Sequence, residues 1–295
     1  MSLAVVFAAF MWANAAWGAP ITFNTALPVA RGNFVLREQL LLTRLGDDPS
    51  GANREVEVFG MVSALGYGVT RNFALFGVLP YLDKTLRLDM GGQRITRDTA
   101  GLGDLVLFGR YTVFEDNAPG RTLRAAPFLG VKTPTGKHDE GDAFGRLPPT
   151  LQLGTGSTDP FAGIVATYQT LDFQIDAQAS FRDNRESGGV EFGDVTRVDA
   201  SLQYRLLPRD FSGGGVPSFL YGVLETNWMH QDKTSIDGNE DPDTGGATLF
   251  LAPGLQYVSK KWIFEAGVQV PILQNLNGNA LENEFTVRAG FRVNI

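Results

Sequence analysis

The chain has 295 residues, no cysteine and a formal net charge of −7 at pH 7. The lack of cysteine excludes a disulfide-stapled scaffold and any thiolate metal ligand or nucleophile. The acidic balance leaves no basic stripe for phosphates, so we expect no nucleic-acid partner. A chain of this length forms one or two soluble domains or a single membrane barrel.

The first 18 residues, MSLAVVFAAFMWANAAWG, contain the only long apolar run and end in small residues that a signal peptidase reads. We therefore expect a signal peptide over 1–18, cleaved after Gly18, and a mature chain over 19–295. No Lys or Arg precedes the apolar run, so either the amino terminus supplies the charge or translation starts upstream. An anchor helix is the alternative, but the run is short and Pro20 would stop it.

The mature chain shows alternation with period two, which is typical of strands that have two different environments. Several of these strands reach the 9–11 residues that a bilayer crossing needs. Only the segment at 248–258 has faces that the pattern does not assign. The twelve predicted strands are 33–45, 55–67, 72–88, 102–114, 121–133, 158–170, 173–183, 194–207, 218–230, 248–258, 262–272 and 284–295.

The connections between these strands alternate between short turns and long polar loops. Residues 171–172 form one of the short turns, whereas 89–101 and 134–157 are among the long loops. This alternation, with an even strand count, is typical of bacterial outer-membrane barrels. A β-sandwich gives no reason for it. The sequence therefore predicts an all-β fold, an antiparallel transmembrane β-barrel of about 12 strands that occupies 19–295 as one domain.

Turn lengths also predict strand register. The turn at 171–172 would place Gln169 opposite Gln174 and Thr167 opposite Asp176, which keeps inward faces together.

A turn centred on Ala118 would place Phe108 opposite Phe128 and Asp104 opposite Lys132. Two aromatic side chains between an acid and a base would form an apolar patch for an aromatic solute. The alternative is ordinary cross-strand packing, worth about 0.2–1 kcal/mol.

Five glycine-rich motifs follow one another along most of the mature chain. They are YGVTRNFALFGVLPY (67–81), GLGDLVLFGRY (101–111), FLGVKTPTGK (128–137), LGTGSTD (153–159) and APGLQY (252–257). Together they resemble the outer-membrane family named after the meta-pathway of phenol degradation. The resemblance implies a β-barrel transporter in the bacterial outer membrane, linked to uptake of aromatic or other hydrophobic compounds. Its implied partners are outer-membrane lipid, the barrel-assembly machinery and a small-molecule solute. Barrels of this kind usually finish on Phe, and this chain finishes on Ile295.

The mixed-charge faces of the strands are the main functional candidates, because they would line the lumen. Interleaved charges of both signs do not favour a strongly ion-selective pore. They would form either a polar conduit or a network of ion pairs that fills a narrow barrel. The candidate lumen-lining residues are Asp104, Phe108, Arg110, Phe128, Lys132, Asp176, Arg182, Arg197, Asp199, Arg205, Glu225, Glu265, Arg288 and Arg292.

Catalytic and metal-binding patterns are weak. The acidic loops 136–145 and 237–246 lack the spacing of an EF-hand, so we expect solvated loops and no metal or other cofactor. A barrel phospholipase would need Ser beside His, and His230 with Ser218 or Ser235 is the only candidate pair in the sequence. We therefore expect no enzyme.

These observations predict a channel for passive or facilitated diffusion of a small solute, with hydrophobic or aromatic compounds as candidates. The alternative is a closed barrel that acts as a structural or interaction protein through its extracellular loops.

Overall fold

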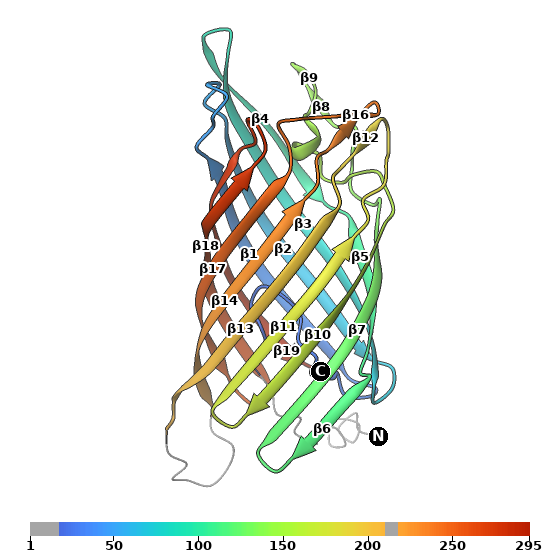
Figure 1. Ribbon diagram of the computed structural model, residues 1–295, viewed down its shortest axis with the longest axis vertical. Helices are drawn as coiled ribbons and strands as arrows, with labels where there is room; N and C mark the ends of the chain where they lie inside the picture. The colour runs from blue at the N-terminus through green and yellow to red at the C-terminus, as the bar shows by residue number, and fades with distance from the viewer. Residues whose placement is uncertain (1–17, 210–217) are drawn as a thin grey trace, which may run out of the picture.

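The computed structural model describes residues 18–209 and 218–295. The chain forms a closed antiparallel β-barrel (Figure 1). The main sheet has 14 strands, but β4, β5 and β6 are successive segments at one position of the wall, so the barrel is twelve strands around. The sheet closes because β19 pairs with β1 while β7 pairs with β10. The predicted fold class is confirmed.

The strand bounds agree with the predicted segments to within a few residues at most positions. The wall strands are β1 (Phe34–Gly46), β2 (Glu55–Gly68), β3 (Phe73–Met90), β4 (Gln93–Leu102), β5 (Leu105–Tyr111), β6 (Phe114–Ala118), β7 (Arg121–Thr133), β10 (Asp159–Thr170), β11 (Phe173–Arg182), β13 (Val195–Leu207), β14 (Phe219–Gln231), β17 (Gly246–Val258), β18 (Trp262–Leu276) and β19 (Glu282–Asn294). The long loops add β8 (Gly141–Asp142), β9 (Gly145–Arg146), the 3-10 turn η1 (Pro149–Leu151), β12 (Val190–Glu191), β15 (Ser235–Ile236) and β16 (Asn239–Glu240).

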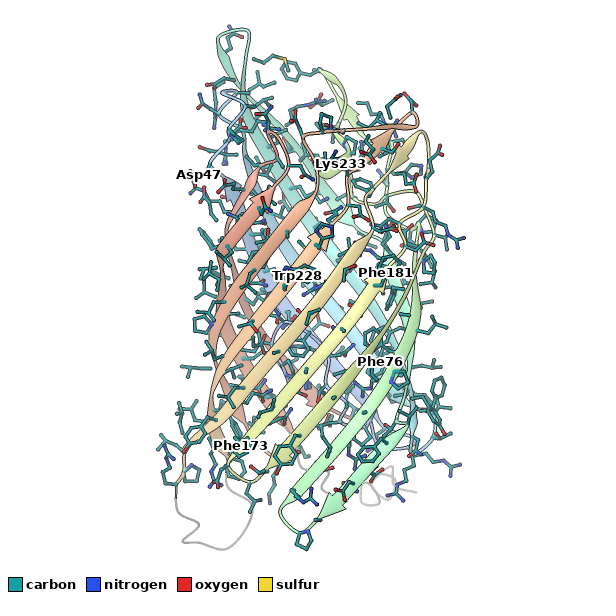
Figure 2. The ribbon with its side chains drawn as sticks, in the orientation of Figure 1. Asp47, Phe76, Phe173, Phe181, Trp228 and Lys233 are labelled. Carbon is teal, nitrogen blue, oxygen red and sulfur yellow. The ribbon has the colours of Figure 1, made fainter. Side chains whose placement is uncertain are left out.

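The outer face of the wall is apolar. Along each strand, large hydrophobic side chains that point outward alternate with buried inward residues, as Leu202 and Leu224 do with Gln203 and Glu225. Figure 2 shows that carbon dominates the outward side chains over the middle of the barrel, while oxygen and nitrogen gather at the end that carries the long loops. An apolar band around a polar interior is the arrangement that a bilayer requires of a barrel. No helix among residues 18–209 and 218–295 is long and apolar enough to cross a membrane.

The region predicted as the long loop 89–101 is instead a tall hairpin. Strand β3 continues to Met90 and β4 returns from Gln93, so that only Gly91 and Gly92 form the turn. Both glycines have positive φ values, 59° and 80°, which a two-residue hairpin turn of this kind needs and which glycine adopts without strain. The prediction was wrong because polar residues and glycine dominate 89–101, which is typical of a loop, and the hairpin extends beyond the apolar band.

The predicted pairing of Phe108 with Phe128 was also wrong, by two residues. Phe108 lies opposite Gly130 and Arg110 opposite Phe128, while Lys132 lies opposite Val106. The tight turn is at 119–120 rather than at Ala118, which shifts the register of β6 on β7 from the predicted one. The irregularity between β5 and β6 reduces this shift by one residue for β5. The net shift is even, so every side chain keeps its predicted face.

The structure also answers one other question of register and one of strand faces. Gln169 pairs with Gln174 and Thr167 with Asp176, as predicted. Strand β17, whose faces the sequence left open, turns Phe250 and Gln256 inward and Leu255 outward.

The two ends of the barrel differ. Short turns such as 171–172 lie at the end where the carboxyl terminus is found, and the long loops lie at the other (Figure 1). By the outer-membrane pattern the short-turn end is periplasmic and the long-loop end is extracellular. Over the extracellular end, Leu147 and Leu151 of the 134–158 loop pack on Leu86 of the tall β3–β4 hairpin.

Candidate functional site

The lumen holds a stretch of the chain that precedes the first strand. Residues 18–33, called here the N-terminal segment, enter from the periplasmic end and reach the middle of the barrel before turning back. Ala19, Ile21, Phe23 and Ala26 are each less than 8% exposed. This placement could not be predicted from the sequence, because the segment lacks periodicity and its hydrogen bonds go to strands far along the chain.

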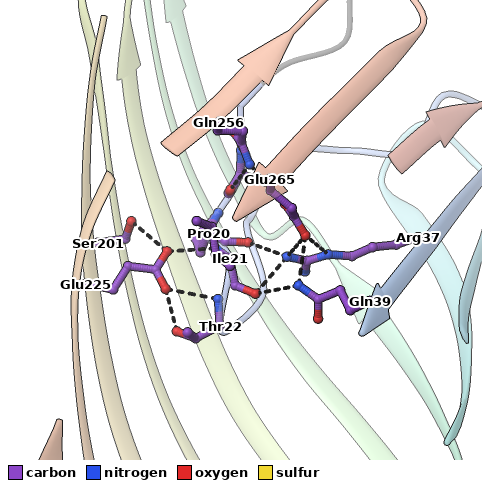
Figure 3. Close-up of polar contacts among 10 residues, drawn as sticks. Pro20, Ile21, Thr22, Arg37, Gln39, Ser201, Glu225, Gln256 and Glu265 are labelled. Carbon is purple, nitrogen blue, oxygen red and sulfur yellow. Dashed lines mark hydrogen bonds and ion pairs between the residues drawn. The ribbon is translucent and has the colours of Figure 1, made fainter. Parts of the chain in front are cut away.

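The tip of the N-terminal segment is bonded to a buried carboxylate of β14 (Figure 3). Glu225 accepts hydrogen bonds from the backbone N–H groups of Ile21 (2.7 Å) and Thr22 (2.9 Å) and from the Thr22 hydroxyl (2.5 Å). Ser201 donates a further hydrogen bond to the same carboxylate at 3.2 Å. Backbone amides without partners in a sheet or helix are thereby satisfied.

A second carboxylate anchors the segment through an arginine and a glutamine (Figure 3). Arg37 forms an ion pair with Glu265 at 2.6 Å and also donates to the carbonyl oxygens of Pro20 and Ile21. Gln39 donates to Glu265 and to the Ile21 carbonyl oxygen. Side chains of β1 and β18 thus fix the backbone of the segment that lies between them.

A third anchor lies on β10. The Thr167 hydroxyl accepts from the Ala26 N–H at 2.8 Å and donates to Asp176 at 2.5 Å. Gln174 donates to the second oxygen of Asp176 at 2.7 Å. From β5, two strands away on the same side of the lumen, Arg110 donates to carbonyl oxygens of Thr25 and Leu27. The segment is therefore bound on several sides.

Four phenylalanines form one side of the lumen, here called the aromatic wall: Phe76 of β3, Phe108 of β5, Phe128 of β7 and Phe161 of β10. Phe76 stacks on Phe108 with ring centroids 4.7 Å apart. Phe108 makes edge contacts with Phe128 and Phe161 at 6.1 Å each. Ala26 of the N-terminal segment packs into this group.

Two glycines make room for these rings. A Cβ at Gly163 would overlap the Phe128 ring, and one at Gly130 would overlap Phe161. The rings therefore lie flat against the backbone of the wall, and the sequence signal for this is a glycine at an inward strand position.

The opposite side of the lumen, here called the polar wall, is formed by the inward residues of β11, β13, β14, β17, β18, β19 and β1. Its carboxylates are buried within hydrogen-bond networks. The Asp199 carboxylate, for example, accepts hydrogen bonds from the side chains of Asn227 at 2.9 Å, Gln178 at 3.2 Å and Arg197 at 3.2 Å. Gln256 joins Glu265 to the Ala19 carbonyl oxygen.

The structure turns every candidate lumen residue to the inside of the barrel. Phe108, Arg110 and Phe128 belong to the aromatic wall or its edge. Asp104 and Lys132 lie nearer the extracellular end, where they form an ion pair at 3.3 Å, and Lys132 also pairs with Asp159 at 2.5 Å. The polar wall carries Asp176, Arg182, Arg197, Asp199, Arg205, Glu225, Glu265, Arg288 and Arg292. The sequence missed Phe76, Phe161, Arg37 and Asp159, although all four lie at inward positions of predicted strands.

A cavity of about 770 Å³ lies between the N-terminal segment and the wall. It reaches the periplasmic turns at Gly120 and Leu171, and its sides include Phe76, Phe108 and Arg292. The lumen is thus narrowed by the segment but not filled by it.

The loops use their carboxylates locally. Arg54 binds Asp48 at 2.6 Å, and this hydrogen bond holds the pKa of Asp48 well below its usual range. Arg97 does the same for the pKa of Asp142. Among residues 18–209 and 218–295, no group of three or more His, Asp or Glu side chains could hold a metal ion. His230 stacks on Trp228 and contacts Asp232 at 3.2 Å.

Comparison with known proteins adds the family. A family model described as "Putative MetA-pathway of phenol degradation" matches residues 49–280. The chain belongs to this family. The match spans most of the chain and includes all five glycine-rich motifs in full, so the predicted resemblance is confirmed. No curated protein sequence matches the chain significantly.

The chain is also similar to solved structures of outer-membrane proteins, and the first of them shares its fold. The COG4313 outer membrane channel from Pseudomonas putida F1 has a TM-score of 0.67 at 14% identity, covering 95% of this chain and all of that one. The β domain of the Bordetella autotransporter BrkA follows with a TM-score of 0.47 at 12% identity, covering 90% of this chain and 100% of that one. The NanC porin has a TM-score of 0.45 at 11% identity, covering 88% and 98%. The protein is an outer-membrane β-barrel similar to the first of these channels.

Proposed function

We propose that the protein is a channel through which small solutes cross the bacterial outer membrane by passive or facilitated diffusion. The observation that carries this proposal is the cavity beside the N-terminal segment, which opens at the periplasmic turns and runs along the segment into the lumen. A barrel whose side chains filled the lumen completely would leave no such space.

Hydrophobic and aromatic solutes are the best candidates for cargo. Phe76 and Phe108 line the cavity and stack on each other, and they present ring surface to a solute. Stacking and edge contacts between aromatic rings contribute about 0.5–1.5 kcal/mol beyond burial. The family name, which refers to phenol degradation, agrees with such a cargo.

A specific observation favours a second candidate, a closed barrel that acts through its extracellular loops. The N-terminal segment narrows the lumen, and the 134–158 loop is fixed over the extracellular end by Lys84, whose ammonium group binds the carbonyl oxygens of Thr150 and Gln152. If these parts never move, nothing passes.

Liposome swelling separates the two candidates. Purified mature chain in liposomes is exposed to iso-osmotic glycerol, arabinose and sucrose, with protein-free liposomes as control. The channel predicts fast swelling with glycerol and a steep fall with solute size. If even glycerol gives only the rate of protein-free liposomes, the channel is wrong and the closed barrel stands.

We also propose that 1–18 is a signal peptide and that 19–295 is a single barrel domain inserted by the barrel-assembly machinery. Residues 1–17 lie outside the described residues. The Gln256 side chain accepts a hydrogen bond from the Ala19 N–H and donates one to the Ala19 carbonyl oxygen. These bonds fit a mature chain that starts near this position. The mass of the membrane-extracted protein is expected to correspond to a chain that begins at Ala19. An intact mass that retains residues 1–18 would contradict the cleavage.

A further inference from the structure

We propose that the lumen selects small anions, and that its preferred cargo is an apolar monocarboxylate such as benzoate. This inference rests on the proposed channel function and names the substrate class. It departs from the sequence expectation, in which interleaved charges of both signs gave no preference.

The carboxylates of the polar wall are out of reach of a solute. Asp176, Asp199, Glu225 and Glu265 are each no more than 4% exposed. Their oxygens already accept hydrogen bonds from amides, hydroxyls and Arg37, as described above. A permeating cation would have to displace these buried donors, which costs free energy. The negative charges therefore organise the wall but offer no free ligand.

Four of the lumen arginines are in a different state, because some of their donors have no partner within residues 18–209 and 218–295. The Nε atoms of Arg182, Arg197 and Arg288 are buried and have no hydrogen-bond partner among the described residues. Within the same described part of the chain, Arg292 makes no hydrogen bond or ion pair, and it lines the cavity. Guanidinium N–H groups without partners are donors that a carboxylate can satisfy, and the pairing is frequently bidentate. The Gln178 and Gln203 side-chain oxygens are also buried without partners in the part of the chain that the structure describes, and Asp159 is paired with Lys132, so the free hydrogen-bonding capacity that belongs to charged groups of the lumen is cationic.

These arginines extend along the whole lumen, and we call them the arginine track: Arg182, Arg197, Arg288, Arg37, Arg292 and Arg110. The first two lie near the extracellular ends of β11 and β13, Arg288 lies in the middle of β19, and the last three lie near the periplasmic ends of their strands. Each member lies close enough to the next for their like charges to repel. Neighbouring sites of the same sign let an ion pass from one to the next without a deep trap.

The cavity combines this charge with apolar surface. Among the residues that the structure describes, arginines are the only charged ones that line it, namely Arg37, Arg110, Arg121, Arg124, Arg197 and Arg292. Phe76 and Phe108 form the facing apolar side, and the Arg110 guanidinium lies 4.8 Å from the centre of the Phe76 ring. An occupant that satisfies both sides carries a carboxylate at one end and a small ring or alkyl group at the other.

The first test is ion selectivity in planar bilayers. Under a KCl gradient, the reversal potential is expected to give a chloride-to-potassium permeability ratio of about threefold or more. Potassium benzoate on one side should reduce the chloride current at millimolar concentration, whereas benzyl alcohol, which has the ring without the charge, should not. A neutral or cation-selective current, or equal block by both compounds, would overturn the inference and leave the channel intact.

The second test places the effect on the track. Arg292→Gln should lower the chloride-to-potassium ratio at least twofold and weaken benzoate block at least fivefold. Arg182→Gln should lower the ratio but leave the block unchanged, because Arg182 does not line the cavity. The control Arg44→Gln, which removes an exposed arginine paired with Glu284, should change neither. Each variant is first checked for the faster unheated gel band of a folded barrel. If one variant does not fold the other still decides, and unchanged selectivity in either folded variant would contradict the track.

The failure of this inference and of the channel are distinguishable. No conductance for any ion, together with no glycerol swelling, would overturn both. Conductance with no anion preference would overturn only the anion selectivity.

Discussion

The aromatic wall and the polar wall hold the same N-terminal segment by different physical means. On the polar wall, Glu225 and Glu265 bind its backbone through directional, charge-assisted hydrogen bonds. On the side of the aromatic wall, Thr167 and Arg110 also bond the segment, but Ala26 packs against phenylalanine rings that themselves depend on glycine for space. Hydrogen bonds fix a backbone at one place, whereas apolar packing tolerates sliding as long as volume is conserved. The difference suggests that the polar wall fixes the position of the segment and the aromatic wall shapes the passage.

The largest expected effect comes from breaking the polar anchor. Glu225→Ala removes the acceptor of two backbone amides and one hydroxyl, at a cost of about 2–4 kcal/mol in docking of the segment. The segment should leave the middle of the lumen, and mean single-channel conductance should rise several-fold. Glu225→Gln keeps one acceptor oxygen and should give an intermediate value. Unchanged conductance in the alanine variant would show that the segment is not held by this contact.

Breaking the aromatic wall should affect stability more than conductance. Phe128 is 7% exposed and contacts two other rings, so Phe128→Ala should lower the free energy of unfolding by about 3 kcal/mol. The urea concentration at which half of the faster unheated gel band is lost measures this change. The matched control is Phe264→Ala on the lipid-facing side, where Phe264 is 53% exposed and the cost should be smaller. Equal shifts in the two variants would contradict a packed aromatic wall.

A smaller effect tests the space that glycine provides. Gly163→Ala would place a methyl group against the Phe128 ring and 2.6 Å from the Ala179 carbonyl oxygen, which should cost about 1–3 kcal/mol by the same urea measurement. At Gly222, the nearest atom to an added Cβ is a Leu206 methyl carbon at 3.4 Å, so Gly222→Ala is the control and should be tolerated. A tolerated Gly163→Ala would mean that the rings do not lie against the wall.

The smallest effect is confined to an extracellular loop that belongs to neither wall. The hydrogen bond from Arg54 lowers the pKa of Asp48 in the folded protein. The stability that this bond gives the loop is therefore present above the pKa of an unfolded Asp, near 4, and is lost only as pH falls through the lowered folded pKa. The amides of Ser50 and Arg54, which donate to Asp48, should therefore stay protected from hydrogen exchange at pH 3 as at pH 7. Asp48→Asn should lower their protection at both pH values and leave conductance unchanged. Protection in the wild type that disappears by pH 3 would refute the lowered pKa.

The comparison also shows how far the candidate site could be predicted. Side-chain alternation placed Asp176, Glu225 and Arg292 on inward faces, and the short turn at 171–172 predicted its register correctly. Their environments could not be predicted, because the partners of Glu225 at Ile21 and Thr22 are about two hundred residues away in the chain and have no periodic pattern. The register near Phe128 failed because the sequence does not indicate the irregularity between β5 and β6.

The sequence by itself determined the fold class, the strand count and the face of each predicted site residue. A period of two and the alternation of short turns with long loops are local properties, and a bilayer admits few folds that satisfy them. Only the tertiary structure decided that the N-terminal segment occupies the lumen and that Phe76 and Phe161 join Phe108 and Phe128. It alone also decided that the carboxylates are enclosed while guanidinium groups face the cavity. Closure of the barrel brings distant strands together, so which charges are satisfied and which stay free depends on the whole wall.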